Sequence, residues 1–219
     1  MPPVVIAGDP HGNFAPILDA CCALAPGTLI LLGDCDLRVP LRQTLASLLE
    51  VGWRVHWIIG NKDAETEVAF DNLVVDHPGG DIGRRVIEAA GLRIAGLGGV
   101  FRPRIWEPPE PPSFATRRAF LDSLRPAEHW RSGLPLWHRD SIFPEDFACL
   151  AARRCDVLVT HEAPSCHRYG FAVIDELAAT MGARLVVHGH HHEAYTAVLA
   201  NGIVVRGLGV AEPWVLRMT

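Results

Sequence analysis

Short apolar runs rich in β-branched residues recur along the chain, and they predict strands. Glycine, proline, aspartate or asparagine bounds each run, and these residues interrupt regular structure. A short apolar run bounded in this way favours a strand over a buried helix. The expected strands cover residues 4–7, 28–32, 55–59, 73–75, 92–97, 157–160, 185–187, 194–199, 203–206 and 214–216.

Helical patterns lie between several of these runs. In one of them Leu41, Leu45, Leu48 and Leu49 form a stripe with helical spacing, and Pro40 suits the first turn. The others cover residues 14–24, 144–153 and 171–181. Strands and helices alternate in the first half, which favours buried parallel strands, whereas the short turns near the end favour antiparallel pairing. Two sheets flanked by helices would accommodate both arrangements.

The segment from about residue 100 to 139 interrupts this alternation. It has proline-rich turns and three tryptophans, Trp106, Trp130 and Trp137. One interpretation is a surface excursion whose tryptophans pack on the main body, another is a lid over an anionic substrate, and a mixture of the two is also open. The segment also carries Arg102, Arg104, Arg117, Arg118, Arg125, Arg131 and Arg139.

Composition and charge narrow the class of protein. The 219 residues fit one domain, 1–219, that carries the insertion at about 100–139. A net charge of −5 argues against a general nucleic-acid binder. No run is long enough to span a bilayer and no secretory signal pattern is present, so we expect a cytoplasmic protein without a membrane partner. The six cysteines are scattered, and we expect reduced thiols that are not metal ligands.

Five polar clusters each follow directly after an expected strand. The carboxyl ends of the strands share one edge in an open α/β sheet, so clusters at these positions can converge on one site. Carboxylate, imidazole and amide oxygen together suit Mn, Fe, Zn or Co. Each residue alone is more often a turn, cap or hydrogen-bonded residue, but independent turn residues have no reason to supply this whole ligand set. The clusters contain Asp9 and His11, then Asp34, then Asn61, then His161, then His190 and His192.

These clusters resemble the signature of the calcineurin-like metallophosphoesterase superfamily. That signature reads D-x-H, then G-D, then G-N-H-[DE], then an isolated His, then G-H-x-H. The chain has its counterparts in the same order between residues 9 and 192: Asp9-Pro10-His11, Gly33-Asp34, Gly60-Asn61-Lys62-Asp63, His161 and Gly189-His190-His191-His192.

The resemblance implies a four-layer α/β/β/α sandwich and two divalent metal ions, which could be Mn, Fe, Zn or Mg, with Mn expected in vitro. Asp9, His11 and His192 would bind one ion, Asn61, His161 and His190 the other, and Asp34 would bridge them. Two such ions leave the site positive and attractive to phosphate. A bridging hydroxide, available because the bound water has a pKa near roughly 7, would attack phosphorus. His188 is expected to support or pack against the site, and His191 is the variable residue of its motif.

Lys62 departs from the signature, which has a histidine there. It is the only lysine in the chain. An ammonium with its ordinary pKa of about 10.4 is a poor acid at neutral pH, although nearby cations and burial lower that pKa. Contact with phosphate, proton donation and no catalytic role are all open for Lys62. The expected catalytic residues are Asp34, Asn61 and Lys62.

Other residues are weaker candidates for the site. Asn13 and Arg102 could contact a substrate, and Glu162 and His167 could line the cleft. The favoured function is hydrolysis of a phosphorylated small molecule or nucleotide by a phosphatase or phosphodiesterase. A nuclease or nucleotide phosphodiesterase of the same superfamily is the alternative. A non-catalytic interaction module is disfavoured because all seven ligand positions are filled.

Overall fold

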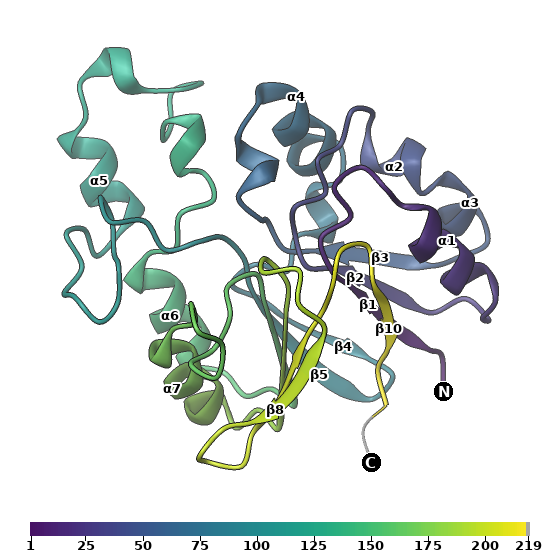
Figure 1. The fold of residues 1–219 in the computed structure, drawn as a ribbon. Helices are drawn as coiled ribbons and strands as arrows, with labels where there is room; N and C mark the ends of the chain where they lie inside the picture. The colour runs from purple at the N-terminus through teal and green to yellow at the C-terminus, as the bar shows by residue number, and fades with distance from the viewer. Residues whose placement is uncertain (218–219) are drawn as a thin grey trace.

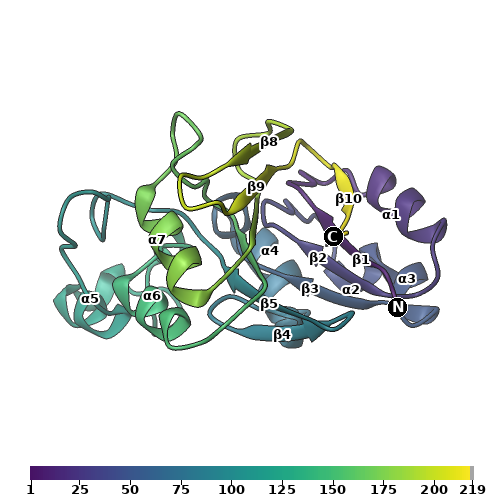
Figure 2. The ribbon, with the colours of Figure 1, turned by 90° about the horizontal axis from the view of Figure 1, so that it is seen from below.

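The computed structural model describes residues 1–217, so the last two residues of the expected domain 1–219 lie outside the described residues. Two sheets pack face to face, and helices cover both outer faces (Figure 1; Figure 2). The expected α/β/β/α sandwich is therefore confirmed. In the described part of the chain, no helix combines the length and apolar character needed to cross a membrane.

The first sheet has the strand order β10-β1-β2-β3. Strands β1 (Val4–Ala7), β2 (Thr28–Leu31) and β3 (Arg54–Trp57) are parallel, and β10 (Pro213–Val215) pairs antiparallel with β1. Side chains alternate along β1: Val5 packs toward the helices, whereas Val4 and Ile6 pack against the second sheet. Both faces are buried, which explains the uninterrupted apolar runs. Helices α1 (Ala15–Cys22), α2 (Leu41–Thr44) and α3 (Ala46–Glu50) cover the outer face.

The second sheet has the order β4-β5-β6-β7-β9-β8. Its four central strands are parallel: β5 (Leu92–Leu97), β6 (Val157–Thr160), β7 (Leu185–His188) and β9 (Val204–Gly207). The edge strands β4 (Val86–Ala89) and β8 (Tyr195–Val198) are antiparallel to their neighbours. Helices α6 (Pro144–Ala151) and α7 (Ala172–Met181) pack on the outer face through Leu150, Ile174 and Leu177.

The expected strand 73–75 was wrong. These residues lie in a π-helical turn, Asp71–Val75, that continues helix α4 (Glu67–Phe70). The hydroxyl of Thr66 caps α4 by accepting the N–H of Ala69 at 3.1 Å. A run of three apolar residues fits the periodicity of a strand and of a helix equally well. The Thr66 cap starts a helix just before this run, and the run continues it.

Strand β4 was missing from the expected elements. It is an edge strand, and Glu88 is exposed while Val86 and Ile87 are only half-buried, so its pattern is weak. Ala90 and Gly91 join it to β5 and both have positive φ, 51° and 76°. Two-residue hairpin turns of this kind favour Asn or Gly at the first position, so an alanine there gives no sequence signal for a turn.

Two further expectations needed correction. The final strands are only partly antiparallel, because β8 folds back along the sheet edge and β9 then runs parallel to β7. The leucine stripe is split into α2 and α3 at Leu45, although Leu41, Leu45 and Leu48 are all buried as the stripe requires. Thr44 Oγ1 donates to the carbonyl of Pro40 at 3.2 Å, a bond that commonly bends helices.

The segment at about 100–139 projects at the upper left of Figure 1 and contains helix α5 (Arg117–Ser123). Trp106 packs edge-on against Phe147 of the main body, with ring centroids 5.0 Å apart, and Trp130 packs in the same way on Phe70 at 5.2 Å. Trp137 is 52% exposed. The segment thus packs on the body through two of its tryptophans. A lid role stays a prediction, and a cavity of about 520 Å³ lies between the segment and the body.

Candidate metal centre

Five of the seven predicted ligands converge in two groups that share Asp34. His11, Asp34 and His192 each offer a ligand atom within 4.8 Å of the others, and so do Asp34, His161 and His190. The contributing loops follow β1, β2, β6 and β7, which are far apart in sequence. The carboxyl ends of the parallel strands in both sheets therefore meet at one edge.

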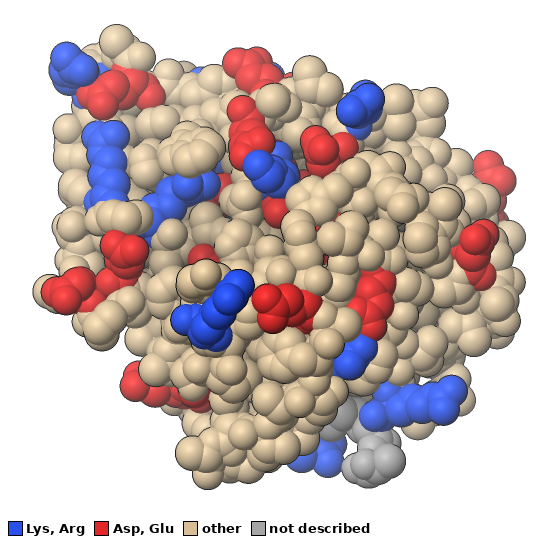
Figure 3. Space-filling model, viewed as in Figure 1, with Lys and Arg blue, Asp and Glu red and all other residues tan. Residues whose placement is uncertain are grey.

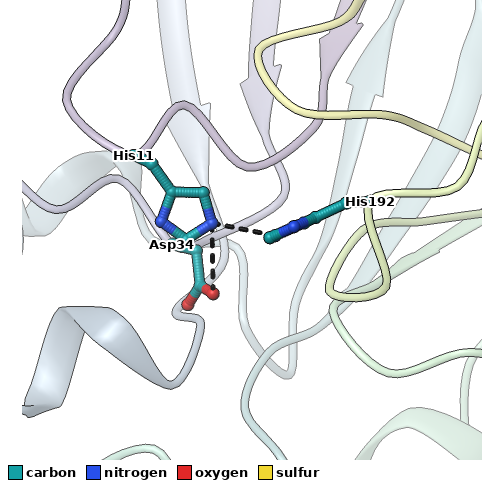
Figure 4. A group of neighbouring side chains, drawn as sticks. All are labelled: His11, Asp34 and His192. Atoms are coloured by element: carbon teal, nitrogen blue, oxygen red, sulfur yellow. Dashed lines mark hydrogen bonds and ion pairs between the residues drawn. The ribbon is translucent and has the colours of Figure 1, made fainter.

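In the first group, two imidazole nitrogens face each other beside a carboxylate (Figure 4). His11 Nε2 lies 2.9 Å from His192 Nε2 and 3.9 Å from Asp34 Oδ2. The rings come from the loops after β1 and β7, on segments 181 residues apart. Two nitrogens and a carboxylate oxygen converging on one point suit a divalent transition-metal ion.

In the second group, hydrogen bonding fixes which nitrogen of His161 is free. Nδ1 donates to the carbonyl of Leu32 at 2.7 Å, so Nε2 keeps its lone pair. That Nε2 lies 3.2 Å from Asn61 Oδ1 and 3.5 Å from Asp34 Oδ1. His190 Nδ1 is buried with no hydrogen-bond partner. Asn61 thus joins this group through its amide oxygen.

Asp9 lies beside the two groups and is fully buried. Its Oδ2 accepts the N–H of His190 at 2.8 Å, and its Oδ1 has no hydrogen-bond partner. Among residues 1–217, neither close group includes Asp9. Its role as a ligand stays a prediction, while its hold on the His190 backbone is a feature of the fold.

The charge of the site calls for cations. Burial, and then the neighbouring charge of Asp34, raise the pKa of Asp9, and the same two causes raise the pKa of Asp63 to about 7. In the described part of the chain, Asp9, Asp34 and Asp63 form no ion pair with lysine or arginine. Buried carboxylates are normally paired or coordinate metals. The residues present therefore fit a pair of divalent cations.

The backbone is strained at the same positions. His11, Asp34, His190 and His192 all have positive φ, between 43° and 69°. Residues other than glycine rarely adopt this conformation, and it costs of order 1–3 kcal/mol each, so it concentrates at functional sites. Gly189 precedes His190 because a Cβ there would lie 2.7 Å from the carboxylate of Asp9.

Asp63 was not expected to have a role, but its side chain holds the loop after β3 in place. It is fully buried and accepts the N–H groups of Cys35 and Gly60, each at 2.8 Å. It therefore ties the loop after β3 to the loop after β2, next to Asp34. The only sequence signal was its place at the acidic position of the G-N-H-[DE] motif.

The side chain of Lys62 lies at the rim of the site. Its ammonium donates to Glu65 Oε1 at 2.6 Å, and this bond raises the pKa of Lys62. Its backbone N–H donates to Asp34 Oδ1 at 2.7 Å. The side chain is 41% exposed. Proton donation would need a lowered pKa, and phosphate contact, proton donation and no catalytic role all stay open for Lys62.

The remaining candidates divide into those near the centre and those held elsewhere. Asn13 is exposed and lines a cavity of about 540 Å³ with His11. His188 is buried and bonds the hydroxyl of Tyr195 at 2.7 Å. His167 stacks on His191 with ring centroids 4.0 Å apart.

A third group with ligand atoms within 4.8 Å joins Glu162, His190 and His191, and the sequence had given His191 no part in the site.

The arginines of the insertion all have partners within the protein. Arg102 is held by Asp140 at 2.6 Å, and Arg139 donates to the carbonyls of Leu134 and Trp130. Basic and acidic residues are interspersed on the face shown in Figure 3. The other pairs are Arg104 and Arg125 with Glu128, Arg117 with Glu145 and Asp146, Arg118 with Asp122, and Arg131 with Glu67 and Asp71.

Comparison with known proteins concerns the sequence and the fold of the chain. A protein of Haemophilus influenzae described as uncharacterized is 42% identical over 195 residues, which are 88% of this chain and 84% of that protein. Among solved structures, TT1561 of Thermus thermophilus superposes with a TM-score of 0.55 at 14% identity, over 96% of this chain and 90% of that one. Phosphopantetheinyl hydrolase of Mycobacterium tuberculosis superposes with a TM-score of 0.57 at 17% identity, with the same coverage. These two structural likenesses concern the fold alone. The model of the calcineurin-like phosphoesterase family matches residues 2–194, and the chain belongs to that family.

Proposed function

We propose that this protein is a cytoplasmic hydrolase of phosphate esters that works with two divalent metal ions. The observation that carries the proposal is the sharing of Asp34 by two close groups of ligand atoms. One carboxylate between two sets of imidazole nitrogens is the arrangement expected of a bridged pair of cations. The proposed ligands are Asp9, His11, Asp34, Asn61, His161, His190 and His192.

Two cations held there would supply positive charge to the phosphoryl oxygens and lower the pKa of a water toward roughly 7. The chain's own residues prepare the site for them. The Leu32 carbonyl fixes the tautomer of His161, and Asp9 holds the backbone of His190. Asn61 adds a neutral oxygen, which keeps the loaded site positive and attractive to phosphate.

The substrate is proposed to be a phosphorylated small molecule or nucleotide, with manganese effective in vitro. The nuclease alternative gains no support from the insertion, because its arginines already have partners within the protein. A free basic surface would be needed to hold a nucleic-acid backbone.

Removal of the metals is expected to abolish hydrolysis. Protein stripped with a chelator should be inactive on a panel of mono- and diesters, and added Mn²⁺, Zn²⁺, Mg²⁺ or Fe²⁺ should restore turnover to differing extents. The metal should also stabilise the fold, by about 2.7 kcal/mol at a free concentration of 100 times Kd. The assay is the phosphate or alcohol released, with the thermal midpoint followed in parallel. The proposal would be contradicted if neither the thermal midpoint nor the activity changed on addition of any of these metals.

Lys62→Ala is expected to lower kcat/KM by about tenfold, roughly 1.4 kcal/mol, with the same factor on esters of good and poor leaving groups. The reason is that the ammonium, charged and held at the rim by Glu65, can contact a phosphate oxygen without donating a proton. The measurement is kcat/KM on a series of aryl and alkyl phosphates.

Glu65→Gln serves as the matched variant, because it removes the charge that pairs with the ammonium and keeps the ammonium itself. A loss in Lys62→Ala confined to poor leaving groups would identify Lys62 as the proton donor. Wild-type kcat/KM on every ester would show that it has no catalytic role.

A further inference from the structure

The two histidines of the second group are oriented by different means. His161 has its Nδ1 fixed by the carbonyl of Leu32 at 2.7 Å. His190 has no such bond: its Nδ1 is buried without a partner, and its Nε2 lies 3.9 Å from Glu162 Oε2. A histidine that binds a metal through one nitrogen almost always donates the other N–H to a carboxylate or carbonyl. Leu32 meets this need for His161. Glu162 is the carboxylate beside Nε2 of His190, but 3.9 Å is longer than a hydrogen bond, so the two groups have to draw closer for the bond to form.

Glu162 is held so that one of its oxygens stays available. It is 5% exposed, and its Oε1 accepts the N–H of Phe101 at 3.1 Å. Its own backbone is fixed by Thr160, whose hydroxyl donates to the Glu162 carbonyl at 2.6 Å. The second oxygen, Oε2, is the one that faces His190. A buried carboxylate with one anchored oxygen and one free oxygen is a rigid acceptor.

We propose, on the basis of the metal centre proposed above, that Glu162 is a positioning residue for His190. Its Oε2 keeps the proton of His190 on Nε2 and orients the ring, so that Nδ1 is presented to the cation shared with Asp34 and His161. The carboxylate also makes the imidazole a stronger electron donor, which tightens metal binding.

The residue that anchors Glu162, Phe101, stands at the start of the insertion. Phe101 follows β5 and belongs to the core of the second sheet, with its ring 5.2 Å from Trp106 and 4.4 Å from Phe171. The aromatic contacts fix the backbone N–H that holds Glu162. The packed core of the second sheet therefore helps to position the carboxylate, which lies in the loop after β6.

A competing arrangement uses the same atoms. Glu162, His190 and His191 offer ligand atoms within 4.8 Å of one another, so a third cation could bind among them. That cation would take the Nε2 lone pair of His190, whereas positioning requires a proton there. The two arrangements differ in the number of metal ions bound.

The test compares Glu162→Gln and Glu162→Ala in the full-length protein. Glutamine keeps the size of the side chain and can still accept the Phe101 N–H, but it removes the charge. Zn²⁺ affinities are measured by competition with a chromophoric chelator, and the visible spectrum of the Co²⁺-loaded protein reports the ligand field. Asp140→Asn is the matched control, because Asp140 is also a buried carboxylate nearby but is held by Arg102 and not aimed at a ligand.

We expect the wild-type protein to bind two equivalents, and Glu162→Gln to bind one of them about 10–100-fold more weakly, with an altered Co²⁺ spectrum. Asp140→Asn should keep both affinities even if its thermal midpoint falls. Wild-type affinity and spectrum in Glu162→Gln would overturn the inference while leaving the metal centre intact. Three equivalents in the wild type and two unchanged ones in Glu162→Gln would also overturn it, in favour of a third cation. Fewer than two equivalents in the wild type would overturn the proposed function and this inference with it.

Discussion

Asp34→Asn is expected to reduce kcat/KM for phosphoester hydrolysis on the order of 10³-fold, about 4 kcal/mol of transition-state stabilisation. Asp34 is the one carboxylate common to both close groups of ligand atoms, so its loss weakens both cation positions at once. Asparagine keeps the size and can still accept the Lys62 N–H, so the loop geometry should survive. The measurements are metal content and kcat/KM at saturating Mn²⁺.

The same variant should have the opposite effect on the metal-free protein. Burial, and after it the charge of Asp34, raise the pKa of both Asp9 and Asp63, so removing that charge relieves repulsion among buried carboxylates. Its removal should raise the thermal midpoint of the chelator-treated protein. Asp36→Asn, an exposed acid two residues away, is the control and should change neither quantity. An Asp34→Asn protein that binds two metals with wild-type affinity would contradict the assignment.

Phe120→Ala is expected to cost about 3–5 kcal/mol of stability in the insertion, the usual range for truncating a buried phenylalanine. Phe120 is fully buried and belongs to a separate small core with Ile105, Leu134 and Phe143. Limited proteolysis of the 100–139 segment and thermal unfolding together measure the effect. Because this core is distinct from those of the two sheets, cleavage should begin in the insertion while the metal affinity is kept.

Arg118→Ala is the control for this variant, since Arg118 is an exposed neighbour on α5. Its pair with Asp122 is solvent-exposed and should contribute less than about 1 kcal/mol. If Phe120→Ala instead released the metals and unfolded the whole protein in one step, the insertion would be part of the main cooperative unit.

Much of the fold could be predicted because the buried strands have a strong local signal. The runs that became β1, β2, β6 and β7 are buried on both faces and are followed by glycine or a polar residue. The errors came where that signal is weak. The run 73–75 has too few residues to separate strand from helix, and β4 is a half-exposed edge strand with alanine in its turn.

The candidate ligands were also predictable, because each follows a strand in a recognisable motif. The motifs could not show which hydrogen bonds and ion pairs each candidate side chain would form. Lys62 is the clearest example: the sequence left three roles open, and only the structure shows that its ammonium bonds to Glu65. Glu162 is another, because its burial and its two separate oxygen contacts depend on Phe101 and His190, which are distant in sequence.

The sequence by itself therefore determined two sheets flanked by helices, from local periodicity, and the family signature with the loops that carry the candidate ligands. The α/β/β/α sandwich was implied by the resemblance that this signature carries. Only the tertiary structure decided that Asp34 is shared by two groups, that Asp63 ties two loops together and that Glu162 faces His190. The physical reason is that hydrogen bonds, burial and charge act between side chains that are neighbours in space. Residues 28 to 181 positions apart along the chain become such neighbours only when strands pair within a sheet and the two sheets pack together.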